Sequence, residues 1–327
     1  MVTTHRTAAA DGATRTVAFT ALAAIAPISW GTTYLVTTEF LPPDRPLLSG
    51  VLRALPVGIA ILLFTRTLPR GQWWWRSAVL GLLNIGAFFA LLFLAAYRLP
   101  GGVAATLTSV QPLIVVGLAL VLLGVRPTTW QLGWGVAGVV GVALMVLRGE
   151  ASFDLVGVVA GAAGAVSMAT GVVLTKRWGR PEGVGLWSFT GWQLTAGGLL
   201  LVPLAAIVEG APPALDAAAI GGYAWLAIVG TLVAYVFWFQ GVGRLPVSAV
   251  TFLGLLSPMV ATALGWLVLG QPLTALQTVG FVVAMVSILG AQLTPETARA
   301  LLRATRRTGM FATRYTDPAH DEGKQRT

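Results

Sequence analysis

The sequence predicts an all-α integral membrane protein with ten transmembrane helices, arranged as two inverted five-helix repeats. Of 327 residues, 56% are hydrophobic and 10% are charged, and the mean hydropathy is +0.80. These values lie well outside the usage of soluble globular proteins. The chain also repeats its own pattern at a constant shift of 146 residues. Composition and repetition together decide the fold class.

Apolar segments long enough for a bilayer follow one another along the chain, since a hydrocarbon core takes about 20 helical residues. Short connectors with proline, glycine and acidic residues separate them, and no soluble domain is inserted. We place the ten spans at residues 18–37, 47–65, 77–96, 101–123, 129–147, 155–174, 186–208, 220–242, 246–269 and 274–293.

The basic residues orient the chain, because cationic loops are retained on the cytoplasmic side of a membrane. With the N-terminus inside, the inner connectors hold most of the Lys and Arg. The outer loops hold the acidic residues Glu39, Asp44, Glu150, Asp154, Glu209 and Asp216. We therefore expect both termini in the cytoplasm. The net charge of +9 does not indicate nucleic acid binding, because the charges lie between apolar spans and not on one face of a soluble domain.

The two termini leave alternatives open. The first span is preceded by Arg6 and Arg15, so it could instead be a cleaved signal peptide, although it is long for that role. The tail after Leu293 is basic and is either a juxtamembrane helix on anionic headgroups or a solvated segment. We divide the chain into a cytoplasmic tail (1–17), two five-helix repeats (18–147 and 155–293) and a basic cytoplasmic tail (294–327).

The internal repeat begins where Arg98-Leu99-Pro100 recurs as Arg244-Leu245-Pro246. The match continues without a gap to Gln131 and Gln277. Five spans per repeat is an odd number, so the second copy enters the membrane from the opposite side and the repeat is inverted. Inverted repeats place a substrate site near the bilayer midplane, between the halves. Other pairs in register are Leu107 with Leu253, Pro112 with Pro258, Leu118 with Leu264, Leu123-Gly124 with Leu269-Gly270, and Thr128 with Thr274.

In these features the chain resembles the EamA-like permeases of the drug/metabolite transporter superfamily, over residues 18–293. The resemblance implies an exporter of small metabolites, often amino acids or drugs, in the cytoplasmic (inner) cell membrane. The residues that carry it are Trp30-Gly31, the intramembrane Arg53, the two Arg-Leu-Pro motifs, Pro112 and Pro258, and the Leu-Gly pairs that end at Gly124 and Gly270.

Arg53 is the one clear charge inside a span, and a guanidinium at the centre of a membrane helix costs about 3 kcal/mol or more. It either faces a protein cavity or extends to the outer headgroups, with Asp44 or Glu39 as partners. Aligning the second and seventh spans places Gln193 opposite Arg53, and two polar groups at matched positions favour a cavity.

Two equivalent spans carry aromatic faces with few polar groups. Asn84 and Phe88 share one face of the third span, and Thr231, Tyr235 and Trp238 share one face of the eighth. Such faces suit a pocket for an amphipathic organic solute. The alternative is aromatic packing between helices, or a belt at the lipid interface.

Gln111-Pro112 and Ser257-Pro258 are predicted in the middle of the fourth and ninth spans, where proline frees a carbonyl and kinks a helix. Such a helix either presents backbone to a substrate or packs its kink against protein. Trp30, Ser167 and Thr170 are weaker cavity candidates. The glycine runs Gly135, Gly138, Gly141 and Gly157, Gly161, Gly164 indicate close helix contacts.

The sequence lacks the residues that several classes of membrane protein require. No Asp, Glu or His falls within a predicted span, so a proton relay through a buried carboxylate has no carrier. Cysteine is absent, and no metal motif, acid pair or Ser/His arrangement supports an intramembrane enzyme. We expect no cofactor and no metal.

The leading hypothesis is a metabolite exporter that works by alternating access, as a monomer or a homodimer, with a small-molecule substrate and the lipid bilayer as its partners. A nucleotide-sugar or organophosphate carrier is the alternative within transporters, but such anions call for more than one intramembrane cation. A membrane receptor or assembly subunit that transports nothing is the third possibility.

Overall fold

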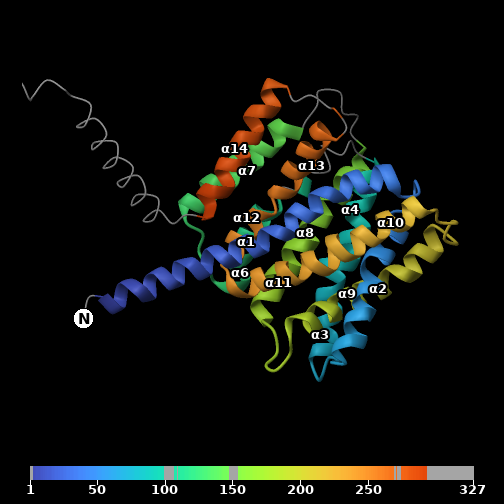
Figure 1. Ribbon diagram of the computed structural model, residues 1–327, viewed down its shortest axis with the longest axis horizontal. Coiled ribbons are helices and arrows are strands. Elements are labelled where there is room, and N and C mark those ends of the chain that lie inside the picture. Colours follow the sequence, from blue (N-terminus) through green and yellow to red (C-terminus); the bar gives the residue numbers. More distant parts are fainter. Residues whose placement is uncertain are drawn as a thin grey trace, which may run out of the picture.

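The computed structural model describes residues 3–98, 107–108, 110–146, 154–268, 270 and 274–292, and the regular secondary structure in these ranges is helical (Figure 1). The α-helices before residue 150 are α1 (Thr3–Phe40), α2 (Pro46–Thr65), α3 (Trp73–Gly81), α4 (Ala87–Arg98), α6 (Gln111–Leu123) and α7 (Thr129–Val146). Those after it are α8 (Leu155–Trp178), α9 (Leu186–Val208), α10 (Ala217–Ala227), α11 (Ala234–Arg244), α12 (Val247–Leu253), α13 (Leu256–Leu267) and α14 (Ala275–Gln292). Two π-helical segments, η1 (Leu82–Gly86) and η2 (Ile228–Val233), join α3 to α4 and α10 to α11.

The helices have the length and the apolar surface of membrane-spanning segments. In the part of the chain that the structure describes, seven helical stretches are long and apolar enough to cross a membrane. Three shorter apolar helices cover Gln111–Leu123, Thr129–Leu144 and Ala275–Ala291. Large apolar side chains such as Phe64 (89% exposed) and Ile207 (82% exposed) point away from the protein. Lipid, not water, satisfies such surfaces, and the chain is a multi-pass membrane protein.

Helices from the two parts of the chain pack against each other (Figure 1). α7 lies along α14 at one edge of the molecule, and α2 lies along α9 at the other. Between these pairs, α1 contacts α11 and α13, while α8 contacts α4 and α6. Small residues permit the close approaches: a Cβ placed on Gly141 would lie 2.6 Å from the backbone nitrogen of Ala284 in α14. The packing role predicted for the glycine run that ends at Gly141 is confirmed.

Residues that match at the 146-residue shift occupy the same local structure. Thr128 and Gln131 form a reciprocal capping box before α7, with Thr128 N–H to Gln131 Oε1 at 3.2 Å and Gln131 N–H to Thr128 Oγ1 at 3.1 Å. Thr274 and Gln277 form the same box before α14, at 2.9 and 3.2 Å. The shared Thr and Gln therefore satisfy the free N–H groups at a helix start.

Glycines at matched positions also adopt matched backbone conformations. Gly124, which follows α6, has φ 67°, and Gly270 has φ 64°. This left-handed conformation is strained for residues with a Cβ and is a common way to end a helix. Gly124 and Gly270, the glycines of the two Leu-Gly pairs, thus share the backbone conformation of a turn, after α6 and after α13 respectively.

The predicted placement of the two prolines in mid-helix is wrong. α6 begins at Gln111 and α13 begins at Leu256, so Pro112 and Pro258 lie in the first turn of a helix. Proline is tolerated there because the first N–H groups of a helix have no intrahelical acceptor. The ninth predicted span is broken instead at Gly254 and Leu255, between α12 and α13.

The second Arg-Leu-Pro motif joins two helices. α11 ends at Arg244, Leu245 is extended, and Pro246 precedes the first residue of α12. Most of the first copy, the N-terminal part of the fourth predicted span and the C-terminal tail lie outside the described residues.

The third and eighth predicted spans contain π-helical segments that the sequence reasoning did not foresee. η1 begins at Leu82 and η2 at Ile228, a difference of 228 − 82 = 146 residues. π-segments disturb the regular backbone ladder and are frequent at functional sites. Side chains from neighbouring helices bind their carbonyls: Ser167 Oγ donates to Leu83 O at 2.9 Å, and Trp30 Nε1 donates to Gly230 O at 3.0 Å.

Candidate functional site

A cavity of about 590 Å³ lies among α1, α2, α4, α6, α8, α11 and the break between α12 and α13. This volume is in the range of sites for small organic ligands. The predicted site residues that line the cavity are Trp30, Arg53, Phe88, Gln111, Tyr235, Trp238 and Ser257. Asn84, Gln193 and Thr231 do not line it, and neither do Ser167 and Thr170.

Arg53 lies in α2 and is 2% exposed. Its Nε–H donates to Thr231 Oγ1 at 2.9 Å, its Nη2 donates to Gly230 O at 2.9 Å, and its Nη1 donates to Thr33 Oγ1 at 3.4 Å. The guanidinium also lies 4.8 Å from the ring centre of Phe89. Its partners are therefore η2 and α1, and not Glu39 or Asp44, which the sequence offered as alternatives.

Aromatic rings form one wall of the cavity. The rings of Trp30 and Tyr235 lie 5.2 Å apart, and those of Trp30 and Trp238 lie 5.0 Å apart. Tyr235 also contacts Phe89 edge to face at 6.2 Å. The two alternatives for these aromatic side chains, packing between helices and lining a cavity, do not exclude each other, because the same rings do both.

The amide pair predicted for the cavity lies outside it. Asn84 Nδ2 donates to Gln193 Oε1 at 2.8 Å and to Thr175 Oγ1 at 3.2 Å, and both amide side chains are 0% exposed. This group joins η1, α9 and α8, as Arg53, Thr231 and Thr33 join α2, η2 and α1. The two polar groups occupy corresponding helices in the two parts of the chain, and one of them, with Arg53, reaches the cavity.

The first span contributes polar residues that sequence reasoning missed. Thr33, Tyr34, Thr37 and Thr38 all line the cavity, and their spacing places them on one side of α1. Four polar residues within six positions of an otherwise apolar span were the available signal. Gly31 allows α1 to pack closely against α13, because a Cβ at this position would lie 2.7 Å from the carbonyl oxygen of Ser257.

The cavity opens toward one end of the bundle. Its lining includes Thr38 and Pro43, both exposed, at the end of α1 and in the following loop. At the opposite end, Lys176 Nζ donates to Leu245 O at 2.9 Å and joins α8 to the end of α11. Arg244 lies 5.5 Å from the ring centre of Phe19 and joins α11 to α1. The lining thus reaches exposed residues at the end of α1, while contacts of Lys176 and Arg244 join the helices at the other end.

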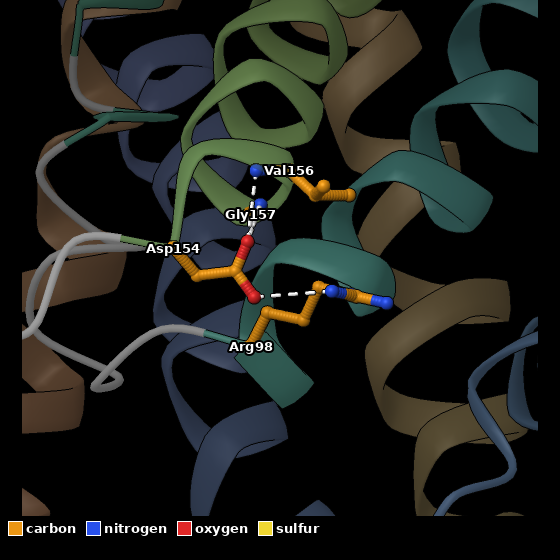
Figure 2. Close-up of polar contacts among 4 residues, drawn as sticks. All are labelled: Arg98, Asp154, Val156 and Gly157. Carbon is orange, nitrogen blue, oxygen red and sulfur yellow. Dashed lines mark hydrogen bonds and ion pairs between the residues drawn. The ribbon is translucent and has the colours of Figure 1, made fainter.

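An ion pair joins α4 to α8 at the open end of the bundle. Arg98 Nη1 lies 3.0 Å from Asp154 Oδ2, and Figure 2 shows the Asp154 carboxylate between Arg98 and the first turn of α8. Asp154 Oδ1 accepts N–H groups of Val156 at 2.8 Å and Gly157 at 3.2 Å. The Gly157 hydrogen bond, followed by the bond to Arg98, lowers the pKa of the Asp154 carboxyl below its ordinary value.

Comparison with known proteins identifies the family to which the chain belongs. The profile of the EamA-like transporter family matches residues 19–147 and 155–292. Protein PecM of Dickeya dadantii (strain 3937) is 49% identical over 257 residues, which cover 79% of this chain and 86% of that protein. The uncharacterized inner membrane transporter YedA of Escherichia coli (strain K12) is 29% identical over 284 residues, covering 82% and 90%.

A further relative is named "Probable amino-acid metabolite efflux pump", from Salmonella typhimurium (strain LT2), and is 26% identical over 285 residues that cover 82% and 92% of the two chains. A protein of known crystal structure shares the fold, with a TM-score of 0.70 at 20% identity over 84% of this chain and 97% of the other. The family match spans both halves of the chain and includes the first predicted span. The chain belongs to the EamA-like transporter family.

Proposed function

We propose that this protein exports small amphipathic metabolites across the cytoplasmic membrane by alternating access, with the substrate held in the cavity beside Arg53. The observation that carries the proposal is the cavity itself. It lies between helices from both parts of the chain, has an aromatic wall, and reaches exposed residues at the end of α1. A site between two halves that rock against each other is the arrangement expected of alternating access.

The proposed architecture is ten spans in two inverted repeats, residues 18–147 and 155–293. The seven long spans and three shorter apolar helices would supply the ten. Support comes from the features that recur at the 146-residue shift: the capping boxes, the left-handed glycines and the π-helical segments. Contacts recur as well, since α4 with α8 corresponds to α11 with α1.

The proposed orientation places both termini in the cytoplasm, in accord with the distribution of Lys and Arg. The loop with Pro43 is then outside, and the conformation described is open to the outside. In the opposite conformation the hydrogen bond between Lys176 and Leu245 would break, and the ends of α8 and α11 would separate. Asn84 and Gln193, which lie in the helical segments that correspond to those of Thr231 and Arg53, would then approach the pathway.

Export, and not uptake, is favoured by a relative that is named as an efflux pump of amino-acid metabolites. A nucleotide-sugar or organophosphate carrier remains the weaker candidate, because Arg53 is the one formal charge among the described residues that line the cavity. Such substrates carry several negative charges and call for further cations.

The test compares extracellular metabolites of cells that lack the gene, cells that overexpress it, and cells with Arg53→Ala or Tyr235→Ala. The wild type should raise the external level of at least one amphipathic solute, and both variants should lose this effect while reaching the membrane in normal amount. Arg126→Ala is the matched control, because it removes an exposed arginine outside the cavity. An unchanged external profile, or full export by both cavity variants, would refute the proposal.

A further inference from the structure

We infer that the cavity selects organic monoanions, with one carboxylate on the guanidinium of Arg53 and a flat apolar body against the aromatic wall. The inference deepens the proposed function, on which it rests, because it takes the cavity as the substrate site. It concerns substrate chemistry and can fail while transport stands.

Arg53 has hydrogen-bonding capacity left over. A guanidinium carries five N–H groups in a rigid fork. Three of them are used by Thr231, Gly230 and Thr33, which leaves one N–H on each Nη atom. Arg53 lines the cavity, and its contacts with η2, α1 and Phe89 fix its plane. A carboxylate can accept one N–H from each Nη atom of a guanidinium, so the two groups that remain can bind one carboxylate.

Charge balance narrows the ligand further. Among the described residues of the lining, no side chain carries a negative charge that could neutralise Arg53. A cationic ligand would be repelled, and a neutral one would leave the desolvated positive charge of Arg53 without a negative counter-charge. A ligand with two or three negative charges would lack further cations. A single negative charge brings the cavity to neutrality.

The same reasoning disfavours a zwitterion. The ammonium group of an amino acid would find no carboxylate in the lining that the structure describes. The face of Phe89 is already covered by Arg53, and the ring of Trp30 packs against Tyr235 and Trp238, so these aromatic surfaces are partly used. The site therefore favours the carboxylate without the α-ammonium.

A second polar group points to an acceptor on the ligand body. Trp238 is 1% exposed, lines the cavity, and has an Nε1–H without a hydrogen-bond partner. The indole N–H is only a donor. The Trp30 indole, by contrast, is satisfied by Gly230 O. A buried donor left without a partner is costly, so a ligand oxygen that reaches this N–H, by a rotation of the indole toward the cavity, would remove that cost.

The experiment uses the full-length purified protein and a probe series that changes charge on one phenyl body. The probes are phenylacetate, 2-phenylacetamide, phenethylamine, phenylalanine and phenylmalonate, and binding is measured by isothermal titration calorimetry. Phenylacetate should bind at least about tenfold tighter than each of the others, as expected for a pair of charge-assisted hydrogen bonds. Equal or tighter binding of the amide, the amine or the amino acid would overturn the inference.

Variants assign the preference to its residue. Arg53→Gln should remove the preference for phenylacetate over the amide, and Arg53→Lys should keep its sign but weaken it, because an ammonium cannot form the fork. Arg126→Gln, a loss of the same charge outside the cavity, should leave the preference unchanged. Retention of the full preference in Arg53→Gln would contradict the assignment. If Arg53→Gln does not fold, the Arg53→Lys result decides, and an unchanged preference there overturns the inference.

The two proposals are separated by their readouts. The probe ranking decides the carboxylate assignment, and the extracellular metabolite comparison decides transport. Arg53-dependent export together with an equal ranking of charged and neutral probes would refute the substrate class alone. A clear ranking without any change of external metabolites would refute transport.

Discussion

Replacing Thr231 with valine tests whether η2 holds Arg53 in place. The substitution keeps the shape of the side chain and removes only the Oγ1 atom that accepts Arg53 Nε–H at 2.9 Å. Thr231 is 0% exposed, so we expect no water to replace the lost oxygen. The cavity wall loses nothing directly, because Thr231 does not line it.

The magnitude follows from the chemistry of a buried charged donor. A hydrogen bond to a charged group contributes about 1.5–3 kcal/mol, and a buried donor without a partner costs a similar amount. We therefore expect Thr231→Val to lower the free energy of unfolding by about 2 kcal/mol. In the Arg53→Lys background the same substitution should cost less than about 0.5 kcal/mol, because lysine has no Nε–H at that position.

The assay is reversible unfolding in mixed detergent micelles, followed for the wild type, both single variants and the double variant. The coupling free energy from this double-mutant cycle isolates the Arg53–Thr231 contact. If Thr231→Val costs the same in both backgrounds, the contact does not stabilise Arg53, and η2 does not hold the guanidinium in place.

Two further predictions concern the scaffold. The lowered pKa of Asp154 means that its charge stabilises the fold above the ordinary value of 3.8, and that this contribution is lost as pH falls below it. The Tm difference between wild type and Asp154→Asn should therefore shrink below about pH 4, and a constant difference would contradict it. Gly141→Val should destabilise by at least about 1 kcal/mol through overpacking against α14, whereas Gly117→Ala, with open space around its Cβ, should be neutral or stabilising in thermal unfolding.

Most of the helices could be predicted because a membrane-spanning helix is recognisable from its length and apolar composition. Nearly every predicted span corresponds to described helix, and residues 186–208 match α9 at both ends. The π-helical segments could not be predicted, since they depend on how neighbouring helices bind backbone carbonyls. Pro112 and Pro258 were misplaced because hydropathy cannot distinguish a kinked helix from one that stops and begins again.

The site was predictable in part, for a reason visible in Arg53 and Asn84. Both are polar residues in apolar spans and both are buried, yet only Arg53 lines the cavity. The sequence pattern therefore does not distinguish the one that lines the cavity from the one that packs against α8 and α9. Thr33 and its neighbours in α1 were missed because threonine is common in membrane helices, where it bonds to its own backbone.

The lone charge of Arg53 bears on how transport would be powered. For a monoanionic substrate, the loaded site is neutral and the empty site carries one positive charge. A membrane potential that is negative inside would then draw the empty site back toward the cytoplasm after each release. Each 100 mV contributes about 2.3 kcal/mol per cycle, enough for a roughly fiftyfold outward concentration ratio. Voltage alone could thus drive export by a protein with no acidic residue in its predicted spans.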